Sequence, residues 1–151
     1  MHPSLSDSNI AEISISYSSK VKASERMQIT KSENADYAFR EVFPSLEHRE
    51  YFYVLFLDRS NRVLGAYQVS SGGITGTVVD PKIVFQAGLK ANATSIILAH
   101  NHPSGQTIPS EADKALTRKM KQAGDILEMP VLDHLIIVPE GYRSFADEGL
   151  I

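Results

Sequence analysis

The stretch SIILAHNHPSG, residues 95–105, decides the fold of this chain. It opens with a short apolar run, SIILA, which predicts a buried β-strand. The strand leads directly into His100 and His102, so both histidines are placed at the end of a sheet. Side chains two residues apart on an extended backbone point to the same side, and these two imidazoles can therefore share one metal ion.

Further apolar segments are predicted to form the other strands. Residues 51–57, YFYVLFL, are apolar throughout, which predicts a central strand buried on both faces. The turn at 58–61 and the segment 62–69 then predict a hairpin. Residues 131–138 and a short piece around 142–145 complete a mixed sheet. Nearer the N-terminus, apolar and polar residues alternate over 10–17, which predicts a half-buried strand, and 27–30 is expected to form a second short extended piece.

Three helices are expected to pack on this sheet. The first is predicted over 33–42 with Ser32 as its N-cap, the second begins at Asp80 and Pro81, and the third runs from Ser110 to about Leu127. The residues predicted on the three inner faces are Ala35, Ala38, Phe39 and Val42; Ile83, Val84, Ala87, Gly88 and Ala91; and Ala112, Ala115, Leu116, Met120, Ala123 and Leu127. The expected fold class is α/β or α+β, a mixed β-sheet flanked by helices in about three layers.

Composition limits the kinds of function that this chain can have. Its 151 residues are enough to bury a core without cross-links, and 42% hydrophobic with 22% charged residues is typical of a globular protein. Because there is no cysteine, a metal must be bound by nitrogen and oxygen. No membrane span or signal-peptide pattern is found, so a cytoplasmic location is expected. The net charge of −3 argues against a general nucleic-acid-binding surface.

Asp113 is the candidate third ligand beside the two histidines. It follows at the start of the third predicted helix, where its carboxylate can face the end of the strand. Two imidazoles and one carboxylate leave an open position on zinc, as in catalytic zinc sites. The alternative interpretation is that Ser110 and Asp113 are only a helix capping pair and that the histidines lie in a surface loop. The whole combination favours a site for one Zn²⁺ ion per chain.

Residues 100–113, HNHPSGQTIPSEAD, resemble the JAMM motif of MPN-type metalloproteins in the form found in the RadC-like family. The resemblance extends to EYFYVLFLD at 50–58, SIILAHNHPSG at 95–105 and LDHLII at 132–137, and so covers roughly residues 45–151. Residues 1–44 are interpreted as a lead-in with short strands and a packing helix, in one compact unit with the rest. Since RadC-like proteins usually carry a helix-hairpin-helix region and nothing here resembles one, a short form of the family is expected.

The resemblance implies a JAMM/MPN-type, cytidine-deaminase-like fold in which His100, His102 and Asp113 bind zinc. It also implies an upstream glutamate that transfers a proton. Glu50 is the matching position because it directly precedes the strand at 51–57, and Glu47, in the same charged stretch, is the alternative.

Other polar residues are candidates for supporting roles. Ser110 matches the family serine whose hydroxyl stabilises an oxyanion or holds the water, and it can cap the helix as well. Asn101, Ser104 and His134 are candidates for orienting the metal ligands, although a core histidine satisfied by its neighbours is an equal interpretation of His134. The glycine-rich segment 70–76 could line a groove for an extended peptide, or it could be a hairpin tip.

The implied activity is that of a zinc metallopeptidase acting on a peptide or isopeptide bond. The metal would activate water, while Glu50 takes its proton and returns it to the leaving amine. One alternative is a DNA-repair-associated accessory protein, an association that comes with the RadC-like name, but the acidic charge argues against direct DNA binding. Another alternative is a scaffold without catalysis, and the complete motif argues against it.

Overall fold

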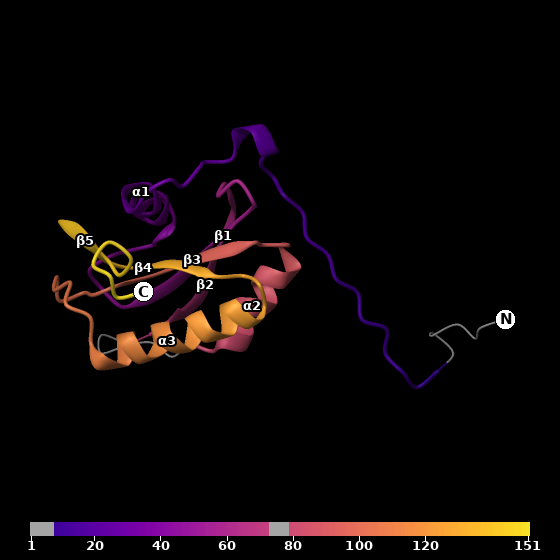
Figure 1. The fold of residues 1–151 in the computed structure, drawn as a ribbon. Coiled ribbons are helices and arrows are strands. Elements are labelled where there is room, and N and C mark those ends of the chain that lie inside the picture. Colours follow the sequence, from indigo (N-terminus) through magenta and orange to yellow (C-terminus); the bar gives the residue numbers. More distant parts are fainter. Residues whose placement is uncertain (1–7, 73–78) are drawn as a thin grey trace.

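The computed structural model describes residues 8–72 and 79–151, and a five-stranded sheet lies at its centre (Figure 1). The order of the strands is β2-β1-β3-β4-β5. Strands β3 and β4 pair in parallel, and the other neighbouring pairs are antiparallel, which confirms the predicted mixed sheet. The strands are β1 Tyr51–Leu57, β2 Val63–Ser71, β3 Ser95–Asn101, β4 Val131–Val138 and β5 Gly141–Ser144.

Strand β1 lies between β2 and β3 and is buried from Phe52 to Leu57, which confirms the prediction of a doubly buried strand. Its side chains alternate between two hydrophobic clusters, one on each face of the sheet. Phe52, Val54 and Phe56 belong to one cluster, and Tyr53, Leu55 and Leu57 belong to the other. An apolar residue at every position is therefore what this strand requires.

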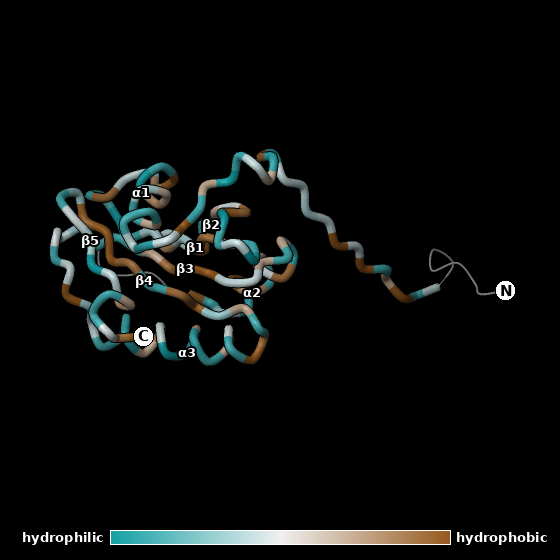
Figure 2. Tube along the Cα trace, turned by 45° about the horizontal axis from the view of Figure 1, so that its top comes forward, coloured by the Kyte–Doolittle hydropathy of each residue, from teal (hydrophilic) through white to brown (hydrophobic). Residues whose placement is uncertain are grey.

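Helices cover both faces of the sheet and give the predicted three layers. Helix α1 (Ser32–Val42) packs on one face, and helices α2 (Pro81–Lys90) and α3 (Glu111–Ile126) pack on the other (Figure 1). The hydrophobic stretches of the chain run through the middle layer, as Figure 2 shows. Because α3 connects β3 to the parallel strand β4, its first turn comes back to the end of β3, where the histidines lie.

Some details of the predicted helices are wrong. Ser32 is not the cap of α1, because its hydroxyl is hydrogen-bonded to Tyr142 and donates to Asp147; the residue before the helix is Lys31. The inner faces also differ. Ile83, Ala112, Ala115 and Leu127 are exposed, whereas Phe85, Thr117 and Gly124 are buried. The inner face of α3 thus consists of Asp113, Thr117, Met120 and Gly124. Its first two residues are polar.

The predicted strand over residues 10–17 is not formed. This segment belongs to an extended arm that projects from the body of the molecule, whereas residues 27–30 do lie against the sheet, with Gln28 bridged to Arg62 (Figure 1). An alternating pattern permits a strand, but a strand also needs a partner, and the described part of the chain offers this segment none. The segment 70–76 is described only to Gly72, where β2 has ended at Ser71; residues 73–78 lie outside the described residues.

Within residues 8–72 and 79–151, none of the helices combines the length and the apolar composition that a membrane crossing requires.

Gly124 supplies a test of the packing between α3 and β4. A Cβ atom there would lie 2.5 Å from the backbone oxygen of Met129, so the chain must shift to admit it. Within a helix, a change from glycine to alanine normally stabilises by about 1 kcal/mol. We expect Gly124→Ala to destabilise instead, by about 1–3 kcal/mol, because the site is overpacked. Urea unfolding measures the change.

The matched control is Ala115→Gly, at an exposed position of the same helix. It should cost about 1 kcal/mol through helix propensity alone. If Gly124→Ala raised the free energy of unfolding, the close approach of α3 to residue 129 would be wrong.

Candidate metal centre

The two histidines converge at the end of β3. The sequence predicts a strand that ends at Ala99, but β3 extends further and includes His100, which is 3% exposed. His102 is half-buried and directly follows the strand. His100 faces the side of the sheet that α2 and α3 cover, because it continues the alternation of Ile96 and Leu98. The Nε2 atoms of the two imidazoles lie 2.9 Å apart.

Asp113 approaches this pair from the first turn of α3. Its Oδ1 lies 3.3 Å from Nε2 of His100, and its Oδ2 lies 3.3 Å from Nε2 of His102. It also takes part in a capping box: the Ser110 hydroxyl accepts from the backbone N–H of Asp113, and the Asp113 carboxylate accepts from that of Ser110. The capping and the ligand interpretations are therefore compatible, since the cap holds the carboxylate against the histidines.

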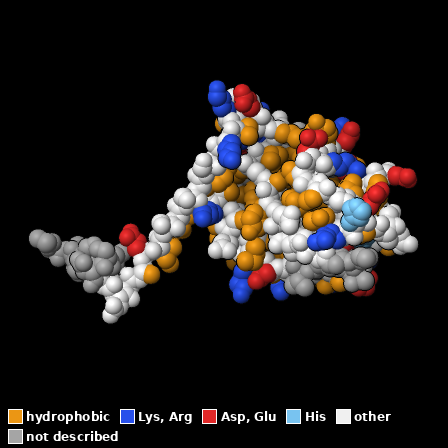
Figure 3. Space-filling view, turned by 180° about the vertical axis from the view of Figure 1, so that it is seen from behind, with side chains coloured by type: hydrophobic (Ala, Val, Ile, Leu, Met, Phe, Trp, Pro, Cys, Tyr) orange, Lys and Arg blue, Asp and Glu red, His pale blue; other side chains and the backbone are white. Residues whose placement is uncertain are grey.

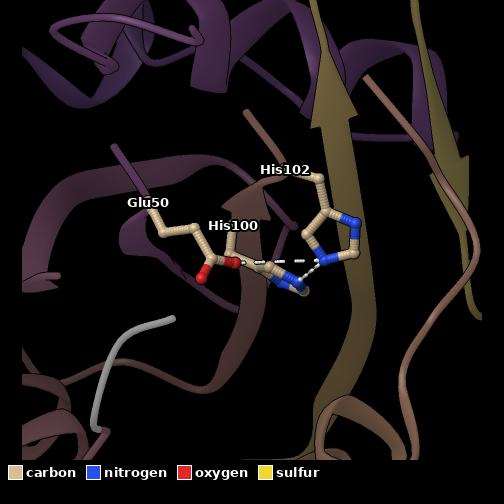
Figure 4. A group of neighbouring side chains, drawn as sticks. All are labelled: Glu50, His100 and His102. Carbon is tan, nitrogen blue, oxygen red and sulfur yellow. Dashed lines mark hydrogen bonds and ion pairs between the residues drawn. The ribbon is translucent and has the colours of Figure 1, made fainter. Parts of the chain in front are cut away.

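Glu50 reaches the same point from the residue before β1. Phe52 pairs with His100 across the two strands, which places Glu50 beside the end of β3. Its Oε1 lies 4.0 Å from Nε2 of His102, and the candidate ligand atoms of Glu50, His100 and His102 lie within 4.8 Å of one another (Figure 4). These three residues could hold a metal ion. Glu47, the alternative glutamate, is exposed.

Asn101 fixes the backbone that carries Glu50. Its side chain donates to the carbonyl oxygens of Leu46 and Arg49 and accepts from the N–H of Tyr51, at 3.0, 2.9 and 2.7 Å. Asn101 was expected to orient a metal ligand. This expectation is wrong, because Asn101 lies on the opposite face of the sheet from His100 and its amide bonds to the segment around Glu50. Its fully buried amide instead ties the segment on both sides of Glu50 to β3.

Ser104 and Ser110 lie at the exposed margin of the centre. The Ser104 hydroxyl accepts from the N–H of Gln106 at 3.4 Å, which is a turn interaction without contact to either histidine ring. Ser110 caps α3 as predicted, and its side chain is exposed above the first turn. Among the described residues, the structure thus brings together Glu50, His100, His102 and Asp113, with Ser110 as their neighbour.

Hydrogen bonds determine where the proton of His134 lies. The Thr117 hydroxyl donates its one hydrogen to the carbonyl oxygen of Asp113, at 2.7 Å. It must therefore accept from Nδ1–H of His134, which lies 2.6 Å away. Complete burial lowers the pKa of His134 well below its usual value, and the nearby His100 adds to this shift. His134 is neutral, and its Nε2 carries a lone pair.

That lone pair in turn orients His100. Nε2 of His134 accepts from Nδ1–H of His100, at 2.8 Å, so in the neutral tautomer of His100 the hydrogen lies on Nδ1 and Nε2 carries the lone pair. His102 is arranged in the same way, because its Nδ1–H donates to the carbonyl oxygen of Gln106 at 2.8 Å. Both Nε2 lone pairs therefore point to the same place.

The two Nε2 atoms lie 2.9 Å apart, and their lone pairs repel each other unless a proton or a cation lies between them. The carboxylate of Asp113 at 3.3 Å from each nitrogen adds negative charge to the same point. Two imidazole nitrogens and one carboxylate are a usual ligand set for catalytic zinc. The residues present fit a divalent cation in their type, their tautomers and their direction.

The surroundings shift the pKa values of three groups in the site. Burial raises the pKa of Glu50, although His100 and His102 oppose the shift. Burial alone would raise the pKa of Asp113 as well, but a proton taken up on Nε2 of either histidine hydrogen-bonds to the carboxylate, and this interaction holds the pKa of Asp113 well below its usual range. The hydrogen bond to Asp113 raises the pKa of His102. Asp113 thus stays ionised to a lower pH than Glu50, and Glu50 is the carboxylate that more readily gains a proton.

Thr117 was missed by the sequence analysis, which followed only apolar residues along α3. The available signal was its position one helical turn after Asp113, on the same face. We expect Thr117→Val, which keeps the shape but removes the hydroxyl, to lower zinc affinity about 10- to 100-fold, as is typical when a partner of a ligating histidine is lost. Nδ1–H of His134 then has no acceptor, and the proton on His100 is no longer held away from the metal.

Thr117→Ser retains the hydroxyl and is the matched control for this prediction. Zinc affinity is measured by competition with a chelating dye, and ¹⁵N shifts of the imidazoles report the tautomer of His100 in the metal-free protein. Equal affinity and an unchanged tautomer in Thr117→Val would show that the hydroxyl has no part in orienting His100.

Comparison with known sequences identifies the family of this chain. The sequence model of the RadC-like JAB domain matches residues 21–150. A UPF0758 protein of Flavobacterium johnsoniae is 50% identical over 123 residues, 82% of this chain and 53% of the relative. UPF0758 proteins of Pelobacter propionicus and Salinibacter ruber are 41% and 38% identical over 134 and 127 residues, covering 83% and 84% of this chain and 58% and 54% of the relatives. The chain spans about half the length of these relatives, and it belongs to the RadC-like JAB domain family.

Proposed function

We propose that this protein is a zinc-dependent hydrolase of the JAMM type that cleaves a peptide or isopeptide bond. The observation that carries the proposal is the convergence of two Nε2 lone pairs and one carboxylate, with a second carboxylate beside them. Three ligands would leave room for water and substrate, which is the arrangement of a catalytic rather than a structural zinc site.

His100, His102 and Asp113 are assigned to holding the ion, and Glu50 is assigned to proton transfer. A zinc ion at this position would lower the pKa of a bound water to near neutrality and polarise the substrate carbonyl. Glu50 lies farther from the His102 nitrogen than Asp113 does, at 4.0 against 3.3 Å, which suits a group that acts beside the ion. Its pKa, raised by burial, lies closer to neutrality than that of an exposed glutamate, and this favours proton exchange.

The residues then divide the hydrolysis among them. Glu50 takes a proton from the attacking water and returns it to the nitrogen of the leaving amine when the C–N bond breaks. Asp113 would stay ionised as a ligand, because a nearby cation favours the charged form of a carboxylate. Asn101 keeps Glu50 in position through the backbone on both of its sides. Ser110 is exposed next to Asp113, where its hydroxyl can meet a substrate oxygen.

Incubation of zinc-loaded protein with a peptide library that includes lysine-linked isopeptides tests the proposal. We expect new carboxyl termini that carry ¹⁸O when the reaction is run in H₂¹⁸O, because one oxygen of the product comes from water. Cleavage should stop with a chelator and return with added zinc. A protein that holds zinc but cleaves no amide bond in this library would contradict the peptidase assignment and leave the metal centre standing.

A further inference from the structure

The arm over residues 10–17 has the side-chain pattern of a strand. Ile13, Ile15 and Tyr17 alternate with Ser14 and Ser16, so an extended backbone places the apolar residues on one face and the hydroxyls on the other. The three apolar side chains are 85, 76 and 42% exposed. Within the described part of the chain, no backbone hydrogen-bond partner is found for residues 11–17. A row of exposed apolar side chains along one face of an extended segment marks a surface that can bind another surface.

Strand β2 forms an edge of the sheet and offers the complementary surface. It is nine residues long, the longest strand among those described, and its middle residues Ala66, Tyr67 and Gln68 are exposed. The strand at the other edge, β5, has only four residues. Long edges that carry free backbone groups are normally covered or made unable to pair, because they bind other strands.

The first residues of β2 are already covered on this outer side. The N–H of Val63 donates to the carbonyl oxygen of Met27, and the N–H of Ile29 donates to that of Asn61, both at 2.8 Å. The short helix Ala23–Glu25 then leads the chain away, and its last contact with the edge is the Tyr17 hydroxyl, which donates to the carbonyl oxygen of Leu64 at 3.1 Å. Among residues 8–72 and 79–151, no further strand pairs with the outer edge of β2 beyond Leu64.

We propose that the arm of one copy, residues 10–17, pairs as a sixth strand with the open edge of β2 in a second copy, and that the two copies exchange their arms reciprocally. Figure 1 shows the arm standing away from its own sheet, and Figure 3 shows hydrophobic side chains both along the arm and on the body where the arm leaves it. Because the arm and the edge that accepts it belong to the same chain, two copies can exchange arms and form a closed dimer with twofold symmetry. Backbone hydrogen bonds supply the attraction, and the isoleucines supply an apolar face.

The exchange also brings the second copy to the margin of the metal centre. The far end of β2, Ser71, pairs with Tyr51, and the N–H of Gly72 donates to the carbonyl oxygen of Glu50 at 2.9 Å. A strand laid along β2 therefore extends toward the segment that carries Glu50. The proposal itself does not depend on metal or on catalysis, and its failure would leave the proposed function unaffected.

Sedimentation velocity of the unmodified chain tests the proposal, and we expect a dimer at micromolar concentration. The double variant Ile13→Asp with Ile15→Asp should be a monomer that keeps the circular dichroism spectrum of the unmodified chain, because both isoleucines are exposed in their own chain. Its melting temperature should fall to that of the unmodified chain diluted below its dimerisation constant, since the stabilisation by the partner is lost. The matched control is Ser14→Asp with Ser16→Asp, which adds the same two charges to the polar face and should remain a dimer. A monomeric unmodified chain, or a dimer that persists in the isoleucine variant, would overturn the proposal.

Cross-linking then identifies the occupant of the edge, and the chain is convenient for it because it contains no cysteine. Ser14→Cys and Ala66→Cys are prepared as separate proteins, mixed, and treated with a short bismaleimide. A cross-linked species that contains one of each chain supports arm exchange. In a protein that carries both substitutions, a link formed within one chain without any between chains would show that the arm folds back on its own β2, which contradicts the exchange.

Discussion

Replacing His100 and His102 together by alanine is expected to remove zinc binding and hydrolysis completely. Two of the three proposed ligands are lost, and Asp113 alone cannot hold the ion against water. Calorimetric titration with zinc should show no binding, and amide hydrolysis should fall to the rate of the protein-free solution. Because His100 is buried beside His134, the variant is also expected to lose stability, so its circular dichroism must be measured.

Two controls separate metal binding from folding. His102→Ala alone changes a half-buried side chain and should keep the fold while weakening zinc binding. His48→Ala removes an exposed histidine and should change neither property. A folded double variant that still binds one zinc ion at the affinity of the unmodified chain would require the metal site to be placed elsewhere.

Glu50→Gln is expected to separate zinc binding from catalysis. The amide keeps the size of the side chain but cannot take up a proton, so we expect kcat to fall about 10²- to 10⁴-fold. Zinc affinity should change little, because the two histidines and Asp113 remain. Single-turnover hydrolysis and a zinc titration on the same preparation provide the two readouts.

Glu47→Gln is the matched control, since it makes the same change three residues earlier in the same charged segment. Glu47 is exposed, whereas Glu50 lies beside His102, so this variant should retain full activity. If Glu47→Gln lost more activity than Glu50→Gln, the assignment of the proton-transfer group would be wrong.

The sequence predicted those parts of the fold that depend on local pattern. The continuous apolar run at 51–57 indicates burial on both faces, and β1 is buried in this way. Asp80 before Pro81 indicates a helix start, and the Asp80 side chain accepts from the N–H of Lys82 at the beginning of α2. The two histidines at the end of an apolar strand indicate a shared site, because side chains two residues apart on an extended backbone point to the same side.

Features that depend on distant partners could not be predicted from pattern. Ser32 was expected to cap α1, but Tyr142 and Asp147, more than 100 residues away, compete for its hydroxyl. Asn101 was expected to support a histidine, but only the sheet shows that it faces the segment before β1. The role of each of these residues depends on which distant segment packs against it, and the whole fold determines that packing.

The central claim is that His100, His102 and Asp113 bind one zinc ion. Crystals grown with zinc, measured just above and just below the zinc absorption edge, test it most directly, because the difference in anomalous signal locates zinc alone. We predict one peak about 2 Å from the two Nε2 atoms and from a carboxylate oxygen of Asp113. No peak between these three side chains in zinc-saturated crystals, or a peak bound by other residues, would contradict the claim.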